Sequence, residues 1–179
     1  MEYNFKVGEP ICIQEILDGI EISIWTENGK VCKNPEVFDK LYNFEEDDFS
    51  DLQGKVIVGT WLKEQSLIKY EDRFYNKWYV DAIIDIATGK YLPQKEVFDY
   101  CIKHGLLCTD VKYVGKFKSI SHCKQFINKP AYGKHMAGIF VKPDGAPVDI
   151  ELTAFASELY EGLCTDKIID ISRIRRQND

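Results

Sequence analysis

The sequence lacks a long apolar run, and its first residues, Met1 to Lys6, do not form a basic region followed by an apolar stretch. We therefore expect no membrane-spanning helix and no signal peptide, and we expect a cytoplasmic protein. Paired Cys-x-x-Cys spacings are also absent, and the histidines stand at no spacing typical of a zinc site. We accordingly expect no metal site and interpret the six cysteines as reduced thiols that mostly fill the core.

Internal repeats, low-complexity tracts and linker-like stretches are absent too. The 179 residues are 45% hydrophobic and 13% aromatic, a composition that excludes a disordered chain or a fibre and allows a large buried core. We expect one domain over residues 1–165, followed by a short C-terminal helix and basic tail over residues 166–179.

Short segments rich in β-branched and aromatic residues predict strands. These segments are Ile11 to Leu17, Glu21 to Trp25, Gly54 to Leu62, Trp78 to Ile86, Met136 to Lys142 and Val148 to Thr153. The dipeptide Asp18-Gly19 predicts a hairpin between the first two strands, and Asn28-Gly29 predicts a second reversal.

Three short segments carry the signals of helix ends. Asn34-Pro35 predicts the start of one helix, and Pro93 opens a second one that ends at Gly105. Ser121 is the expected cap of a third helix that runs to Ile127. Together these elements predict an α+β domain with antiparallel sheets and flanking helices.

Charge is unevenly placed, although the net charge of −6 taken alone argues against binding to nucleic acid. Between Val111 and Lys142 there are seven lysines and no acidic residue, so this stretch carries +7 and the rest of the chain −13. Tyrosine, phenylalanine and histidine side chains lie among these lysines. This mixture is typical of a surface that binds RNA or another anion, but an ordinary solvated surface has the same composition.

Five segments form an ordered series of motifs along the chain. They are Glu15 to Trp25, Gly59 to Leu62, Trp78 to Ile86, Ala137 to Pro143 and Ile150 to Glu158. The series resembles the nucleotidyltransferase-type ligases, and most of all the RNA ligases of the phage RNA ligase 2 type. The resemblance implies an ATP-grasp-like adenylation domain, the RNA ligase domain in which a lysine attacks the α-phosphate of ATP.

The departures from this family fall on the positions that carry its chemistry. Ile16 stands where the resemblance places the nucleophilic lysine, and an isoleucine has no lone pair with which to attack phosphorus. Thr60 and Ala137 replace two carboxylates that bind the ribose and a metal ion in the family. Glu151 and Thr153 replace two lysines that contact phosphates there. We therefore expect a pseudoenzyme that uses no cofactor.

The leading hypothesis is a non-catalytic RNA-binding protein. The resemblance implies a phage protein in the host cytoplasm, a counter-defence inhibitor of the anti-CRISPR type that holds an RNA, such as a transfer-RNA (tRNA) fragment, against a nucleic-acid-targeting complex. As the one family lysine that remains, Lys142 is expected to contact an anion or to point to solvent. The predicted RNA-binding residues are Lys112, Lys116, Lys118, Lys124, Lys129, Lys134, Lys142, Arg173, Arg175 and Arg176.

Three alternatives remain open on sequence alone. The acidic stretch from Glu45 to Asp51 is typical of a solvated loop, and it also suits a protein-interaction inhibitor that mimics nucleic acid. The remodelled nucleotide pocket suits a sensor or sponge for a small nucleotide. Residual ligase activity through another lysine, such as Lys6 or Lys30, is the third alternative.

Overall fold

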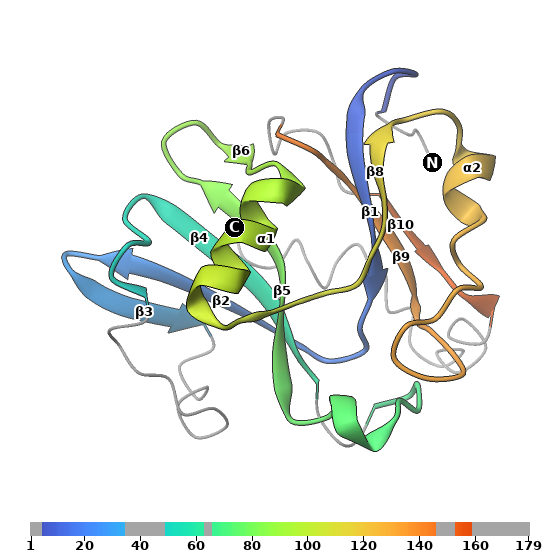
Figure 1. Cartoon of the computed structure of the whole chain (residues 1–179), viewed down its shortest axis with the longest axis horizontal. Helices are drawn as coiled ribbons and strands as arrows, with labels where there is room; N and C mark the ends of the chain where they lie inside the picture. The colour runs from blue at the N-terminus through green and yellow to red at the C-terminus, as the bar shows by residue number, and fades with distance from the viewer. Residues whose placement is uncertain (1–4, 35–48, 63–65, 146–152, 159–179) are drawn as a thin grey trace.

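A computed structural model describes residues 5–34, 49–62, 66–145 and 153–158 of the chain. Its strands form two sheets that lie side by side in Figure 1. The four-stranded sheet has the order β10 (Thr153–Ala156), β9 (Gly138–Pro143), β1 (Pro10–Ile16) and β8 (Val111–Lys116). The larger sheet has the order β3 (Lys30–Asn34), β2 (Ile20–Glu27), β4 (Lys55–Leu62), β5 (Lys77–Asp85) and β6 (Lys90–Tyr91).

Neighbouring strands in both sheets run antiparallel, as the sequence predicted, except that the short β7 (Leu107–Cys108) pairs parallel with β5. One expected pairing is wrong, because β1 and β2 do not form a hairpin at Asp18-Gly19. Both edges of β1 are taken by β8 and β9, and the chain crosses at this point into the other sheet. The Asp18 carboxylate accepts hydrogen bonds from the N–H groups of Leu67 and Ile68 and so fixes the crossover.

The second predicted reversal is confirmed as a hairpin between β2 and β3. Its two turn residues, Asn28 and Gly29, have φ angles of 51° and 74°. Two consecutive residues with positive φ are what a two-residue hairpin loop needs to match the twist of its strands, and asparagine followed by glycine tolerates them best.

Helix α1 (Gln94–His104) lies where the sequence predicted it and ends at Gly105, which adopts φ 65° in the left-handed region. Helix α2 (Ile120–Lys124) is shorter than expected, and its cap is Ser119 instead of Ser121. The Ser119 hydroxyl accepts the N–H of His122, which is the bond expected of a side chain that caps a helix. A single 3-10 turn, Asp72–Phe74, precedes β5.

Several predicted elements fall outside the described residues: the helix from Pro35, most of the strand Val148 to Thr153, and the C-terminal helix. Strand β8 was not predicted, since its lysines and Gly115 break the apolar alternation that marks a half-buried strand. The five described cysteines are free thiols, and three of them (Cys12, Cys101 and Cys123) are buried in the core as expected. Among the described residues, no helix has the length and apolar character needed to cross a membrane.

Three apolar clusters hold these layers together. One lies between the larger sheet and α1, and includes Ile57, Trp78 and Val97. A second covers the outer face of the four-stranded sheet, where Ile13 and Ile139 meet the α2 segment. The third joins the two sheets and is described below because it contains two of the positions singled out from the sequence.

Candidate functional site

Two of the positions singled out from the sequence, Ile16 and Ala137, meet in the cluster that joins the sheets. Ile16 and Ala137 are 5% and 0% exposed and pack with Leu62, Tyr79 and Phe140. Ile16 pairs with Gly138 across β1 and β9, which places it beside Ala137. Both positions therefore present hydrocarbon to the space between the sheets.

Two tyrosines, Tyr79 and Tyr132, line the same cluster, and the hydroxyl group of each forms a hydrogen bond with the main chain. Burial raises the pKa of Tyr79 to about 12, and its hydroxyl donates to the carbonyl of Phe74. Burial likewise raises the pKa of Tyr132 far above its ordinary value, and the Tyr132 oxygen accepts the N–H of Asp110. Both phenols are therefore engaged in hydrogen bonds, and burial favours their neutral form.

Thr60, another position singled out from the sequence, is buried and forms a hydrogen bond inside the protein. Its hydroxyl donates to Asp81 Oδ2 at 2.8 Å, and the Thr109 hydroxyl donates to Asp81 Oδ1 at 2.7 Å. Asp81 is 0% exposed and is the extra residue of a β-bulge, because Val80 pairs with Gly59 and Ala82 with Val58. The two hydroxyls satisfy the buried carboxylate from both sides.

Lys142 belongs to this interior network and does not point to solvent. It is 0% exposed, and its Nζ donates to the main-chain carbonyl of Asp81 at 2.8 Å. The bond ties β9 to β5, and so ties one sheet to the other. Nearby, burial raises the pKa of Cys12 to about 12 although the Lys142 charge lowers it, so this thiol stays protonated. Lys142 thus forms a hydrogen bond between the two sheets.

Glu151 lies outside the described residues, as do Arg173, Arg175 and Arg176. Thr153 is described by its backbone alone, which pairs with Val141 at the end of β10. The acidic stretch is described only from residue 49 onward. There Asp51 accepts hydrogen bonds from Tyr100, Lys103 and His104 and so joins this segment to α1.

Of the seven lysines between Val111 and Lys142, Lys112 is also withdrawn from the surface. Its side chain is 8% exposed, and its Nζ lies 3.0 Å from Glu15 Oε2 and 2.6 Å from Asp110 Oδ2. Glu15 is fully buried, and burial raises the pKa of its carboxyl although the bonds from Lys112 and from the N–H of Ala131 lower it. Lys112 therefore neutralises a buried acid.

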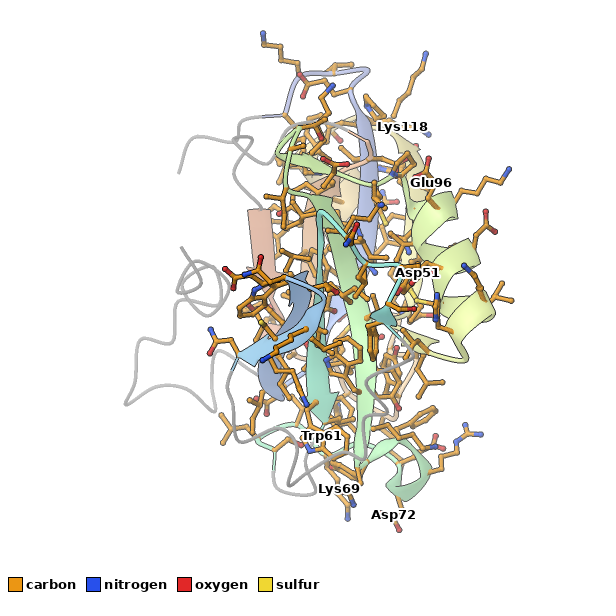
Figure 2. All side chains as sticks on the ribbon, turned by 90° about the vertical axis from the view of Figure 1, so that its left-hand side faces the viewer. Asp51, Trp61, Lys69, Asp72, Glu96 and Lys118 are labelled. Carbon is orange, nitrogen blue, oxygen red and sulfur yellow. The ribbon has the colours of Figure 1, made fainter. Side chains whose placement is uncertain are left out.

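The remaining five lysines are exposed, and four of them lie on β8 or on the segment that follows it as far as residue 129. We call this group the lysine face; it consists of Lys116, Lys118, Lys124 and Lys129. Among the described residues, none of the four takes part in an ion pair. Lys118 lies at the upper end of the molecule in Figure 2, far from Lys69 and Asp72 at the opposite end.

Lys134 is exposed as well but lies apart from the lysine face. Its neighbour Gly133 sits against the backbone of Lys69 and Tyr70, next to the 3-10 turn. The aromatic residues expected among the lysines divide in the same way. Phe117 and Tyr132 are buried in two different clusters, and Tyr113 packs half-buried beside the lysine face.

Comparison with known proteins gives a match in structure alone. No family model matches the sequence, and no curated protein matches it. An RNA ligase mutant from Naegleria gruberi with AMP and Mn superimposes with a TM-score of 0.66 at 14% identity, over 89% of this chain and 53% of that one. An archaeal ATP-dependent RNA ligase gives a TM-score of 0.64 at 14% identity, over 88% and 44%.

The chain has the nucleotidyltransferase fold of RNA ligases. It spans about half the length of the solved ligases that it matches. On this RNA ligase fold, the first motif runs from β1 into β2, the next two lie on β4 and β5, and the fourth forms β9. The resemblance seen in the sequence is confirmed at the level of the fold.

The donor atoms at the described positions that the sequence analysis singled out, Ile16, Thr60 and Ala137, do not fit a divalent cation. Ile16 and Ala137 offer none, and the Thr60 hydroxyl donates its proton to Asp81. Both Asp81 oxygens in turn accept from threonine hydroxyls. Within the part of the chain that the structure describes, no group of three or more histidine, cysteine or acidic side chains is arranged to hold a metal ion.

Two buried partners in this site could not have been named from the sequence. Asp81 lies within the motif Trp78 to Ile86 and Glu15 begins the first motif, and neither motif indicates a partner for its acid. The signal that was present is an acidic residue inside an otherwise apolar strand, since a buried carboxylate needs a partner and usually marks an internal network. Which lysine or hydroxyl supplies that partner depends on the strand order.

Proposed function

We propose that this protein binds RNA and does not carry out ligase chemistry. The single observation that carries the proposal is the separation of charge in the structure. The interior positions that correspond to the ligase chemistry hold hydrocarbon and internally bonded polar groups. By contrast, the exposed lysines of the lysine face form no ion pair among the described residues. Binding to phosphates requires positioned cations and no nucleophile.

The comparison supports RNA as the class of partner, because the two solved proteins reported above are RNA ligases. The net charge of −6 does not oppose this proposal. Screening limits the reach of a charge to about 8 Å at physiological ionic strength, so a local group of lysines attracts phosphate even in an acidic protein.

A binding experiment tests the first half of the proposal. The protein is purified from the cells that express it, and the absorbance ratio and extracted nucleic acid are examined. Nucleic acid is then removed in high salt, and the affinity for labelled RNA is measured by fluorescence anisotropy in about 50 mM salt. We expect co-purified RNA and an affinity that falls steeply as salt increases. A protein that emerges free of RNA and binds none at low salt contradicts the proposal.

A labelling experiment tests the second half. The protein is incubated with radiolabelled ATP and magnesium or manganese, and covalent label is sought after denaturing electrophoresis. We expect none, and none for Ile16→Lys either, because Thr60 and Ala137 still supply no carboxylate. A labelled wild-type band overturns the pseudoenzyme proposal. Labelling of Ile16→Lys alone would mean that the missing lysine is the only defect.

The counter-defence role, with a transfer-RNA fragment and a CRISPR complex as partners, stays a prediction from the resemblance. Of the acidic stretch proposed for protein docking, the described Asp51 is turned toward α1, where three side chains share its carboxylate. A nucleotide in the remodelled pocket would meet the apolar cluster around Ile16 and Ala137. The lysine face is therefore the site that we favour.

A further inference from the structure

Three aromatic rings are gathered beside the lysine face, on the outer side of the four-stranded sheet. Tyr113 comes from β8, and His122 and Phe126 come from the α2 segment. The ring centroids of Tyr113 and His122 are 4.9 Å apart, those of His122 and Phe126 are 5.5 Å apart, and those of Tyr113 and Phe126 are 6.0 Å apart. All three residues are half-buried. The planes of Tyr113 and Phe126 are inclined by 30° to each other, and the His122 ring stands edge-to-face to both, at 77° and 85°.

The backbone of β8 is adapted to the position of the Tyr113 ring. A Cβ atom added to Gly115 would lie 2.6 Å from the Tyr113 Oη and 2.8 Å from its Cζ. The ring therefore extends along the strand over a residue that has no side chain, and its hydroxyl donates to the carbonyl of Lys116. Among the strands of the described residues, β8 is also the edge of its sheet.

Lysines stand around these rings at cation–π distance. Lys118 Nζ lies 6.0 Å from the centre of the Tyr113 ring, and Lys129 Nζ lies 5.2 Å from that of Phe126. Farther along the same surface, Lys124 Nζ lies 5.3 Å from the Phe155 ring. Cations and accessible rings in one surface are the combination that single-stranded nucleic acids bind, with phosphates on the cations and bases on the rings.

We infer that Tyr113, His122 and Phe126 form a stacking platform for unpaired bases, and that the RNA bound by the lysine face is single-stranded. This inference rests on the proposed RNA-binding function and names its substrate class. A duplex would gain from the lysines alone, because the faces of its bases are already stacked on one another. An unpaired base covers the rings and displaces the lysines toward phosphates, since an exposed cation–π contact stabilises less than a base–aromatic stack.

Three ligands of equal length test the inference with the full chain: a single-stranded RNA of about 12 nucleotides, the same strand in a duplex, and an abasic sugar-phosphate strand. Their affinities are measured by fluorescence anisotropy at one salt concentration. We expect the single strand to bind about 10- to 100-fold more tightly than the abasic strand. A single strand that contains 2-aminopurine should also lose fluorescence on binding, because the analogue is quenched when it stacks.

Three variants localise the effect. Tyr113→Leu and Phe126→Leu remove a ring but keep apolar bulk against the core, and each is expected to weaken single-strand binding about 5- to 30-fold. Gly115→Ala removes no ring and no charge, but its added Cβ forces the Tyr113 ring to move. We therefore expect it to weaken single-strand binding as well. The matched control is Phe74→Leu, since Phe74 is a half-buried ring with Arg73 at 4.6 Å on another surface. Urea denaturation verifies that each variant is folded.

The outcomes separate this inference from the proposal beneath it. Loss of single-strand affinity in the three folded variants, with unchanged affinity in Phe74→Leu and for the abasic strand, supports the platform. Equal binding of all three ligands, with no effect of the ring variants, overturns the platform and leaves RNA binding through lysines intact. Absence of binding to any RNA, in a folded wild-type protein, overturns both.

Discussion

Between the two sheets, Lys142 and Asp81 are completely buried and hydrogen-bonded, whereas the four cations of the lysine face are exposed and unpaired among the described residues. Both regions carry lysines from the same acid-free stretch of sequence. The difference is that a buried charge is held by partners which satisfy it, and an exposed charge is free to meet an external anion. A lysine kept at a motif position is therefore no sign that the chemistry of the motif is kept.

The RNA ligase fold makes this comparison instructive. The four-stranded sheet supplies Lys142 from β9 to the interior, whereas the lysine face lies on β8 and on the segment that follows it. Figure 1 shows α2 beside β8 at the outer side of this sheet, away from the larger sheet and α1. The two regions can therefore be altered separately, and four variants test the comparison.

The largest expected effect comes from reversing the lysine face. Replacing Lys116, Lys118, Lys124 and Lys129 by glutamate should lower RNA affinity roughly 1,000-fold, because four phosphate contacts become repulsive. The matched control reverses four exposed lysines of the other half, Lys69, Lys77, Lys90 and Lys95. Anisotropy titrations compare the two variants at equal net charge. Similar losses in both would mean that overall charge, and not this face, governs binding.

Lys112→Met should lower the stability of the protein, whereas substitution of the lysine face should lower its RNA affinity. The Lys112 substitution leaves the buried Glu15 carboxylate without its cation and should lower the free energy of unfolding by about 3 kcal/mol. Since burial already raises the pKa of Glu15, the loss should be small near pH 4 and grow as pH rises toward neutrality. Urea denaturation measures it. If the folded variant binds RNA markedly more weakly, Lys112 contacts RNA and the assignment of Lys112 to the interior is contradicted.

Lys142→Met tests the interior. It leaves the bulged carbonyl of Asp81 without its donor and should cost about 2 kcal/mol of stability, with no change in RNA affinity of the folded protein. Chemical denaturation and anisotropy are measured on the same sample. Loss of RNA affinity without loss of stability would show that Lys142 contacts the ligand after all.

Asp51→Asn should have the smallest effect, because Asp51 is on the surface. Desolvation raises the pKa of Asp51, but the bonds from Lys103, His104 and Tyr100 outweigh it and lower the pKa to about 2. Its contribution of about 0.5 kcal/mol should be present above pH 4 and disappear as pH falls toward 2. Denaturation midpoints at pH 7 and pH 3 check this. A larger deficit at pH 3 than at pH 7 would contradict the assigned contacts.

Local patterns predicted the elements better than their partners. The alternation around Ile57 and Ile83 and the glycine at position 105 marked strands and a helix end correctly, because those signals act within a few residues. Strand pairing was wrong at Asp18-Gly19 because the partners of β1 come from more than ninety residues later in the chain. No local pattern records that distance.

The same limit applies to the site. The isoleucine at position 16 was visible in the sequence, and the expectation that no lysine there attacks phosphorus stays a prediction. The destinations of Lys112 and Lys142 were not visible there, because each depends on which strand lies opposite: Lys142 pairs with Cys12 across β9 and β1 and faces the larger sheet from there. The meeting of Tyr113 with Phe126 likewise needs β8 to lie against the α2 segment.

The most direct test of the account is ultraviolet crosslinking of the bound RNA, followed by mass spectrometry of the crosslinked peptides. The account predicts crosslinks within residues 113–129, with Tyr113 or Phe126 as attachment points, and none to the peptides of β4 and β5 that line the interior. Crosslinks concentrated on β4 and β5, with residues 113–129 unmodified, would place the RNA between the sheets and contradict it.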